Sequence, residues 1–276
     1  MRNGERRVDL QGVRAKLDRA NGHALELQIA IDNLFDIDQE CFRIEVDSTG
    51  LVYKIYSTSI PTVDLRWSVI VGDILTNLRS ALDHLAYQLV LLDGGKPNRE
   101  TKFPILESAA KGPPVLFPGI RRNDIQTLIE EVQPYKRGEG NSARQHQLWA
   151  LNKLVNVDKH RLLLVVQVVL DEGNVYWGST PEIGRPKVWL ARDPIVSNMH
   201  VATFDFPETS PGPEFAPHFS LTARLDEGPH DSQFRTRPLI QLMAQVEDFV
   251  NVSVINRFAP LFPLDTPGHP GAHGHW

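Results

Sequence analysis

The fold of this chain is decided by the stretch Trp67–Leu92, which reads WSVIVGDILTNLRSALDHLAYQLVLL and contains no Lys and no Glu. Apolar residues recur in it at three- and four-residue steps, the spacing that places side chains on one face of an α-helix. The run ends at Asp93-Gly-Gly95, and glycines are typical of a helix C-terminus. We therefore expect a long amphipathic helix, and the members of its apolar stripe are Val71, Leu75, Leu78, Leu82, Leu85 and Leu89.

The opposite face of this expected helix is polar but carries only short or ring-bearing side chains. At about 100° per residue, Asp73, Asn77, Ser80 and His84 fall on one narrow stripe opposite the leucines. A solvated face on so long a helix usually carries Lys or Glu, which are soluble and form helices well. Their absence favours a half-buried polar cleft, packed against another element, over a plain solvent-exposed face.

Further segments with helical spacing flank this stretch, and two β-rich regions interrupt them. The turn residues Asp47-Ser-Thr-Gly50 lie between two arms rich in aromatic and β-branched residues, which predicts a hairpin. After Arg161 the pattern changes to short β-branched runs separated by Gly/Pro loops. The other expected helices are Val8–Phe35, Asn123–Val132, Ser142–Val157 and Arg237–Phe258, and the expected strands are Phe42–Val46, Leu51–Tyr56, Leu162–Leu170, Val175–Gly178, Lys187–Ala191, His200–Phe206 and Phe219–Leu225.

This order of elements predicts an α+β fold, namely a helical bundle with an N-terminal β-hairpin and an antiparallel sheet in the C-terminal half. We expect a single domain over residues 1–259. Its helical core would comprise residues 8–160 and 237–258, and its sheet region residues 161–226. The segment 260–276 is rich in Pro, Gly and His, and we expect it to be a disordered tail.

The bulk composition bounds the class of protein. The chain has 276 residues, of which 41% are hydrophobic and 23% charged, as in ordinary folded proteins. Its formal charge of −5 argues against a general nucleic-acid coat, which would carry a basic excess, but not against an enzyme that grips RNA at one site. The lone cysteine, Cys41, excludes an internal disulfide framework and a multi-thiolate metal site. The charged N-terminus and the lack of an apolar run of about 18 residues predict a cytoplasmic protein that does not span a membrane.

A second cluster of charged residues lies at Asn156-Val-Asp-Lys-His-Arg161, where a helix should give way to a strand. Asp158 falls on the apolar side of that helix, and a buried carboxylate needs a cationic or hydrogen-bonding partner. Our hypothesis is that Asp158 or Asp83 pairs with Arg79 and fixes its guanidinium beside His84. Arg79 and Asp83 lie one helical turn apart, close enough to pair. The alternative is a purely structural ion pair at a helix terminus.

The arrangement of Arg79, Ser80 and His84 on a helix of a bundle resembles the HEPN superfamily, a group of compact α-helical domains. In that family the motif is an arginine, usually followed by a polar residue, and then a histidine after a few positions. Many members are metal-independent ribonucleases of toxin–antitoxin, abortive-infection and other defence systems, whereas others are inactive binding modules. The resemblance implies a ribonuclease, or a protein that binds RNA or a nucleotide, in a bacterial or phage defence or toxin context.

The resemblance also implies roles for individual residues and requires no metal or cofactor. RNA supplies its own nucleophile, the 2′-hydroxyl, so the protein need only position it, move a proton and stabilise charge. His84 would be the general acid or base, and Arg79 would hold the scissile phosphate. Ser80 or Asn77 would orient the ring or the phosphate. A homodimer would bring a second histidine, and the residues that could supply phosphate-binding charge instead are Lys159, His160 and Arg161.

Two other classes of function compete with a ribonuclease. In the first, the protein is a non-catalytic structural or interaction protein, and a network of Arg79, Asp83, His84 and Asp158 only fixes helix packing. In the second, it is a ligand-binding enzyme or sensor that uses the sheet and the Trp-containing strands. Solvent exposure discriminates between catalysis and structure. An open groove lined by Arg79 and His84 favours catalysis, whereas a sealed and hydrogen-bonded arrangement favours the structural role.

Overall fold

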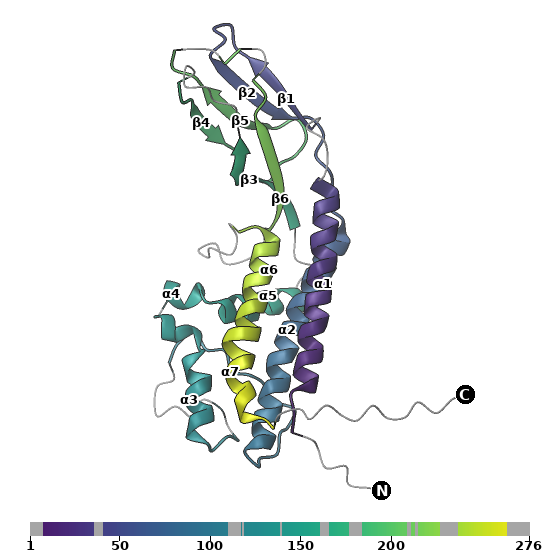
Figure 1. Cartoon of the computed structure of the whole chain (residues 1–276), viewed down its shortest axis with the longest axis vertical. Helices are drawn as coiled ribbons and strands as arrows, with labels where there is room; N and C mark the ends of the chain where they lie inside the picture. Colours follow the sequence, from purple (N-terminus) through teal and green to yellow (C-terminus); the bar gives the residue numbers. More distant parts are fainter. Residues whose placement is uncertain are drawn as a thin grey trace, which may run out of the picture. The chain divides into compact units, whose positions relative to one another are not determined.

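The α+β fold is confirmed by the computed structural model, in which helices and antiparallel sheets alternate along the chain (Figure 1). By compactness the chain divides into two units, each assembled from separate stretches of sequence. Unit 1 contains residues 1–22, 73–160 and 244–276, and unit 2 contains residues 23–72 and 161–243. The single domain expected over residues 1–259 stays a prediction, since this division measures compactness and not independent folding. The structure describes residues 8–35, 41–109, 117, 119–138, 140–160, 166–176, 184–208, 211–212, 215–226 and 237–263.

The quoted stretch forms α2, which extends over Leu65–Leu92. Each of the six residues of its apolar stripe is completely buried. Burying a leucine or valine side chain contributes roughly 1.5–3 kcal/mol, so this stripe is a major source of stability. The other long helix is α1 (Gln11–Phe35). Neither these two nor the other helices of the described residues are long and apolar enough to cross a membrane.

Shorter helices follow α2, and one of them departs from expectation. The helix expected over Ser142–Val157 is broken at Gln145 and His146. The Nδ1 atom of His146 accepts a hydrogen bond of 3.1 Å from the N–H of Leu148, and His146 thereby caps the helix that begins at the next residue. The helices of this region are α3 (Asn123–Glu131), η2 (Pro134–Arg137), α4 (Asn141–Arg144) and α5 (Gln147–His160).

The C-terminal run, expected as one α-helix over Arg237–Phe258, changes its hydrogen-bonding pattern in the middle. Its central part is a π-helix, whose wider turns are rare in proteins. Phe262 is buried, so the fold extends a few residues into the expected tail, and residues 264–276 lie outside the described residues. The run comprises α6 (Leu239–Asp248), η4 (the π-helix Phe249–Ile255), α7 (Asn256–Phe258) and η5 (Ala259–Leu261).

Unit 2 holds the sheets. The N-terminal hairpin and two strands of the C-terminal half join in one four-stranded antiparallel sheet, in the order β1-β2-β5-β4. The remaining two strands, β3 and β6, form a separate antiparallel pair. The strands are β1 (Phe42–Val46), β2 (Val52–Ser57), β3 (Val166–Tyr176), β4 (Lys187–Leu190), β5 (His200–Asp205) and β6 (His218–Leu225).

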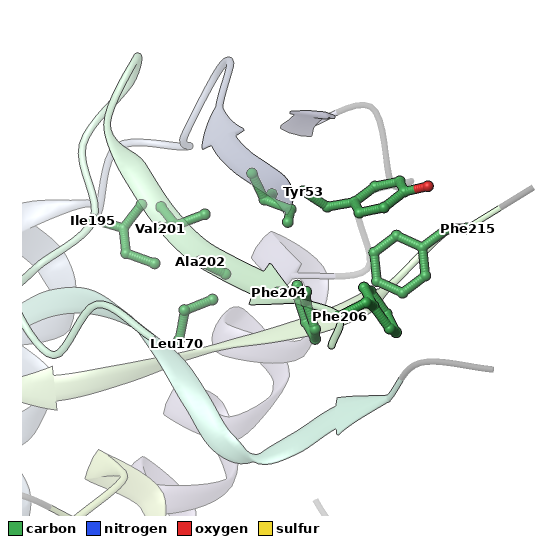
Figure 2. Packing of buried hydrophobic residues seen from close by; sticks show 9 residues of the cluster. Tyr53, Leu170, Ile195, Val201, Ala202, Phe204, Phe206 and Phe215 are labelled. Carbon is green, nitrogen blue, oxygen red and sulfur yellow. The ribbon is translucent and has the colours of Figure 1, made fainter. Parts of the chain in front are cut away.

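One face of the central strands β2 and β5 of the four-stranded sheet packs into a hydrophobic core rich in aromatic rings, shown in Figure 2. The ring of Phe204 meets the edge of Phe215 at 5.2 Å, and Phe206 meets the same ring at 5.4 Å. Tyr53 packs on Phe215 as well, and its hydroxyl donates to the carbonyl of Gly212. Edge-to-face ring pairs of this kind add specificity to simple burial.

The opposite face of that sheet carries a row of planar side chains, one from each strand, which we call the ladder: Arg43, Tyr56, His200 and Trp189. The guanidinium of Arg43 lies 4.4 Å from the centre of the Tyr56 ring. The centres of Tyr56 and His200 are 5.3 Å apart, and those of His200 and Trp189 are 4.8 Å apart with the rings parallel. These spacings are close to the distance between neighbouring strands, so the ladder follows from the sheet register.

Candidate functional site

Arg79 and Asp83 form an ion pair on α2, within unit 1. The guanidinium donates from Nη2 to Asp83 Oδ1 at 2.9 Å and from Nε to Oδ2 at 3.3 Å. Two parallel bonds of this kind fix the plane of the guanidinium as well as its position. Of the two partners offered by the sequence, Asp83 and Asp158, the structure joins Arg79 to Asp83.

The pair is also fastened to the backbone of Phe103, in the loop that follows α2. Arg79 Nη2 donates to the Phe103 carbonyl at 2.8 Å, and the Phe103 N–H donates to Asp83 Oδ1 at 2.9 Å. The Phe103 ring is buried and meets the edge of Phe258 at 6.5 Å. Arg79, Asp83 and Phe103 thus form a closed unit, which we call the clip.

The same loop is held at neighbouring points. Gln133 Nε2 donates to the carbonyl of Pro104, and its Oε1 accepts from the N–H of Leu106. The Glu107 carboxylate accepts from Arg144 Nε at 2.8 Å and from Trp149 Nε1 at 3.1 Å. These two donors lower the pKa of Glu107. The clip is therefore the first of several points that fix the loop.

Little of the Arg79 guanidinium is accessible. The residue is 9% exposed, and the buried Nη1 atom has no hydrogen-bond partner among the described residues. A phosphate would have to displace Asp83 or the Phe103 carbonyl to reach Nε or Nη2, and Nη1 is buried. The arrangement suits a guanidinium that organises the protein interior better than one that meets a substrate.

His84 lies elsewhere on α2. It is five residues from Arg79, which corresponds to about 140° around a helix, and its side chain is exposed. A methyl group added to Gly12 of α1 would lie 2.9 Å from His84 Nδ1, so the ring rests against the α1 backbone where no side chain intervenes. Arg79 and His84 thus face different surroundings.

Part of the polar face of α2 packs along α1, whereas Asp73 and His84 on the stripe expected to line a half-buried cleft are exposed. Gln88 Oε1 accepts from the N–H of Asp9 at 3.2 Å, just before α1 begins. About one turn farther along α1, His84 lies against Gly12. After a second turn of α1, Asn77 Oδ1 accepts a hydrogen bond of 3.4 Å from Lys16 Nζ. We call this line of contacts the polar seam. Asn77 Nδ2 in turn donates to the carbonyl of Asp73, and Ser80 is half-buried on the same face.

The second charged cluster stands apart from the clip. Asp158 is half-buried near the end of α5, and burial raises the pKa of its carboxyl, as does the negative charge of Asp73. Lys159 is exposed, and its charge acts on Asp158 in the opposite direction. The His160 side chain and Arg161 lie outside the described residues.

A groove that sequence reasoning missed runs between the first turns of α1 and the C-terminal run, both in unit 1. Arg14, Asp18 and Asn21 line it from α1, and Glu247 and Asn251 line it from the opposite side. Polar residues at positions i, i+4 and i+7 of α1 were a visible signal of a shared helix face. The opposite wall was not visible, because the π-helix sets which residues of the C-terminal run face α1.

Comparisons with protein-family models, curated proteins and solved structures found no match for this chain. The HEPN resemblance and the roles that it implies for Arg79 and His84 therefore stay predictions.

Proposed function

We propose that this chain is a non-catalytic interaction protein, in which Arg79 and Asp83 fix the packing of unit 1. The observation that supports this most directly is the occupied guanidinium: Arg79 donates to Asp83 and to the Phe103 carbonyl and is 9% exposed. Recruiting Arg79 to a phosphate would leave the Asp83 carboxylate without its cation and the Phe103 carbonyl without its donor in a half-buried site. Breaking such an arrangement costs on the order of a few kcal/mol.

A metal-independent ribonuclease is the second candidate, and the exposure of His84 favours it. An accessible imidazole can contact a substrate and serve as its general acid or base. In this function His84 would act on RNA at the surface of α2, and the phosphate would be held by cations other than Arg79, such as Lys159. A homodimer would supply a second imidazole.

One experiment separates the two functions. An end-labelled RNA of mixed sequence is incubated with the protein in excess EDTA, beside the variants His84→Ala and Arg79→Ala. Matched controls are His218→Ala and Arg19→Ala, which remove exposed residues of the same types. Light scattering of the same samples, with and without RNA, reports the mass of the protein and of any complex.

The interaction protein is expected to leave the RNA intact, with His84→Ala as stable as the parent and Arg79→Ala melting about 5–10 °C lower. Cleavage to 2′,3′-cyclic phosphate ends that disappears in His84→Ala but persists in His218→Ala would contradict the proposal and establish the ribonuclease.

A further inference from the structure

The groove between α1 and the C-terminal run has two adjoining lobes. Their volumes are about 290 and 430 Å³, and both are lined by Leu10, Arg14, Asn256 and Ala259. Volumes of about 300–1,000 Å³ are typical of small-molecule sites. All lining residues belong to unit 1.

The smaller lobe is polar. α1 contributes Arg14 and Asp18, one turn apart, and Asn21 beyond them. The C-terminal run contributes Glu247 and Asn251. One carboxylate therefore lies on each wall of the lobe, with the Arg14 guanidinium on the α1 wall and an amide on each side.

The larger lobe is mainly apolar. It is bounded by Leu10 on one side and by residues that follow α7 on the other. A ligand that filled both lobes would place a polar group in the first and an apolar group in the second. The apolar residues that follow α7 here are Ala259, Pro260, Phe262 and Pro263.

The π-helix η4 forms part of the polar wall through Asn251 and Ile255. Wide π-turns cost regular hydrogen bonding and occur frequently at functional sites. Here the turn is anchored from inside, because Val250 and Val254 are completely buried and the ring of Phe249 packs against His146. The packing therefore holds an irregular backbone beside the groove.

Glu247 is a half-buried carboxylate that lines the polar lobe together with Arg14 and Asp18. Burial raises the pKa of Glu247, and the neighbouring charge of Asp248 raises it further. Among the described residues Glu247 has no ion-pair partner, although Arg14 and Asp18 line the same lobe from α1. A positively charged ligand in this lobe would stabilise the ionised carboxylate.

We propose that the groove is a binding site for a small organic cation with an apolar substituent. The ammonium group would lie between Glu247 and Asp18, with Asn251 as a hydrogen-bond acceptor, and the apolar part would lie on Phe262. The described residues hold no group of three His, Cys, Asp or Glu side chains suited to a metal ion, and the apolar lobe gives an inorganic cation nothing to contact. This site is independent of whether Arg79 and His84 act in catalysis.

The test uses 2-phenylethylammonium as the probe and 2-phenylethanol and ammonium chloride as its neutral and non-aromatic counterparts. Binding to the full chain is measured by calorimetry and by amide chemical shifts at pH 7.5. Glu247→Gln keeps the shape of the side chain and removes its charge, and Phe262→Ala removes the aromatic ring that lines the apolar lobe. Glu100→Gln serves as an exposed control in the same unit.

We expect 2-phenylethylammonium to bind in the millimolar range, with shifts in Asn251 and Asn256, and to bind about tenfold more weakly to Glu247→Gln. Phe262→Ala should weaken it as well, whereas Glu100→Gln should not. Lowering the pH should weaken binding to the parent more than to Glu247→Gln, because the raised pKa of Glu247 brings protonation of its carboxyl to a higher pH. Equal binding of 2-phenylethanol, equal weakening by Glu100→Gln, or no shifts at the groove would each overturn the proposal.

Discussion

Arg79 shows how one side chain can fasten a loop to a helix. Its guanidinium joins a carboxylate one turn away to a backbone carbonyl 24 residues along the chain. Asp83 binds the same loop residue, because its carboxylate accepts a hydrogen bond from the Phe103 N–H. Apart from the Nη1 atom of Arg79, the polar groups of the clip satisfy one another, so the cost of losing one member exceeds the value of any one bond.

We therefore expect Asp83→Asn and Arg79→Ala each to reduce the free energy of unfolding by about 2–4 kcal/mol, because each leaves a partner unpaired in a half-buried site. The double replacement Arg79→Ala/Asp83→Asn should cost less than the sum, since no charge is then left alone. Urea denaturation of the four proteins measures the coupling. Strict additivity would show that the two residues do not act as a unit.

His146 makes the stability of unit 1 depend on pH. The residue is 5% exposed, and burial, together with the charge of Arg137, lowers its pKa to about 4. Its Nδ1 must stay unprotonated to accept the Leu148 N–H. Between pH 4 and 6.5 the unfolded chain binds the proton and the folded chain does not, so the stabilisation is complete above pH 6.5 and disappears as the pH falls towards 4.

The loss over this interval is expected to be roughly 2–3 kcal/mol. Urea unfolding at pH 5 and pH 7.5 measures it, in the parent and in His146→Gln. Since carboxylates contribute their own pH dependence, the informative quantity is the difference between the two proteins. An identical pH dependence in His146→Gln would show that the ring does not carry the effect.

At the scale of single residues, the sequence predicted the pairing of Arg79 with Asp83 but not the hydrogen bonds of both to the Phe103 backbone. Spacing of four on a helix places the two side chains together, whereas the third member, Phe103, comes from an irregular loop whose path no periodicity encodes. The same holds for His146, whose capping role depends on a helix break between Arg144 and Gln147.

Among the elements, the four-stranded sheet relies on both of its faces. The inner face is the aromatic core, and the outer face carries the ladder, which ends at Trp189 on β4 with half of that residue exposed. Cross-strand ring pairs contribute about 0.5–1.5 kcal/mol beyond their burial. The ladder therefore ties the short strand β4 to β5.

Trp189→Ala is expected to destabilise the protein by about 1 kcal/mol, and Trp189→Phe by less, because a smaller ring still stacks on His200. Thermal melts of these variants, of His200→Ala and of the double variant give the coupling of the two rings. The control is Val46→Ala, an exposed change on β1 outside the ladder. A Trp189→Ala melt that matches the Val46→Ala melt would mean that the stack is incidental.

The π-helix left a faint trace in the sequence. Val246, Val250, Val254 and Phe258 are all completely buried and follow one another at four-residue intervals. An α-helix would rotate such a series by about 40° at each step, away from a fixed core. A wider turn keeps the four residues facing inward. A curved α-helix would bury the same four positions, so the sequence alone does not distinguish the two kinds of helix.

For the whole molecule, the fold class could be predicted because long periodic segments identify their own type. The arrangement could not, since the pairing of β2 with β5 joins residues such as Val52 and Asp205 that no local pattern connects. The division into two interleaved units could not be predicted for the same reason, since it also depends on contacts between segments far apart in the sequence. The chain passes between them at residues 22/23, 72/73, 160/161 and 243/244.

Three of these four passages fall inside helices, namely α1, α2 and α6. Because helix formation is cooperative, melting of either unit should shorten helices that also serve the other. We expect one calorimetric transition, which both Leu82→Ala in unit 1 and Phe204→Leu in unit 2 shift downward as a whole. The exposed change Val196→Ala should leave it in place, and a variant that splits the transition in two would contradict the expectation.

The polar seam also limits how α1 and α2 can slide past one another. Two helices joined only by leucines can move by a turn, about 5.4 Å, and find another set of apolar contacts at little cost. Such a step here would remove Gln88 from the Asp9 N–H, Asn77 from Lys16 and the His84 ring from the gap at Gly12. The seam contributes few kcal/mol, yet it selects one alignment among several of similar apolar burial. On this account a polar face without Lys or Glu fixes the axial alignment of the two helices, because short side chains reach only the partner directly opposite.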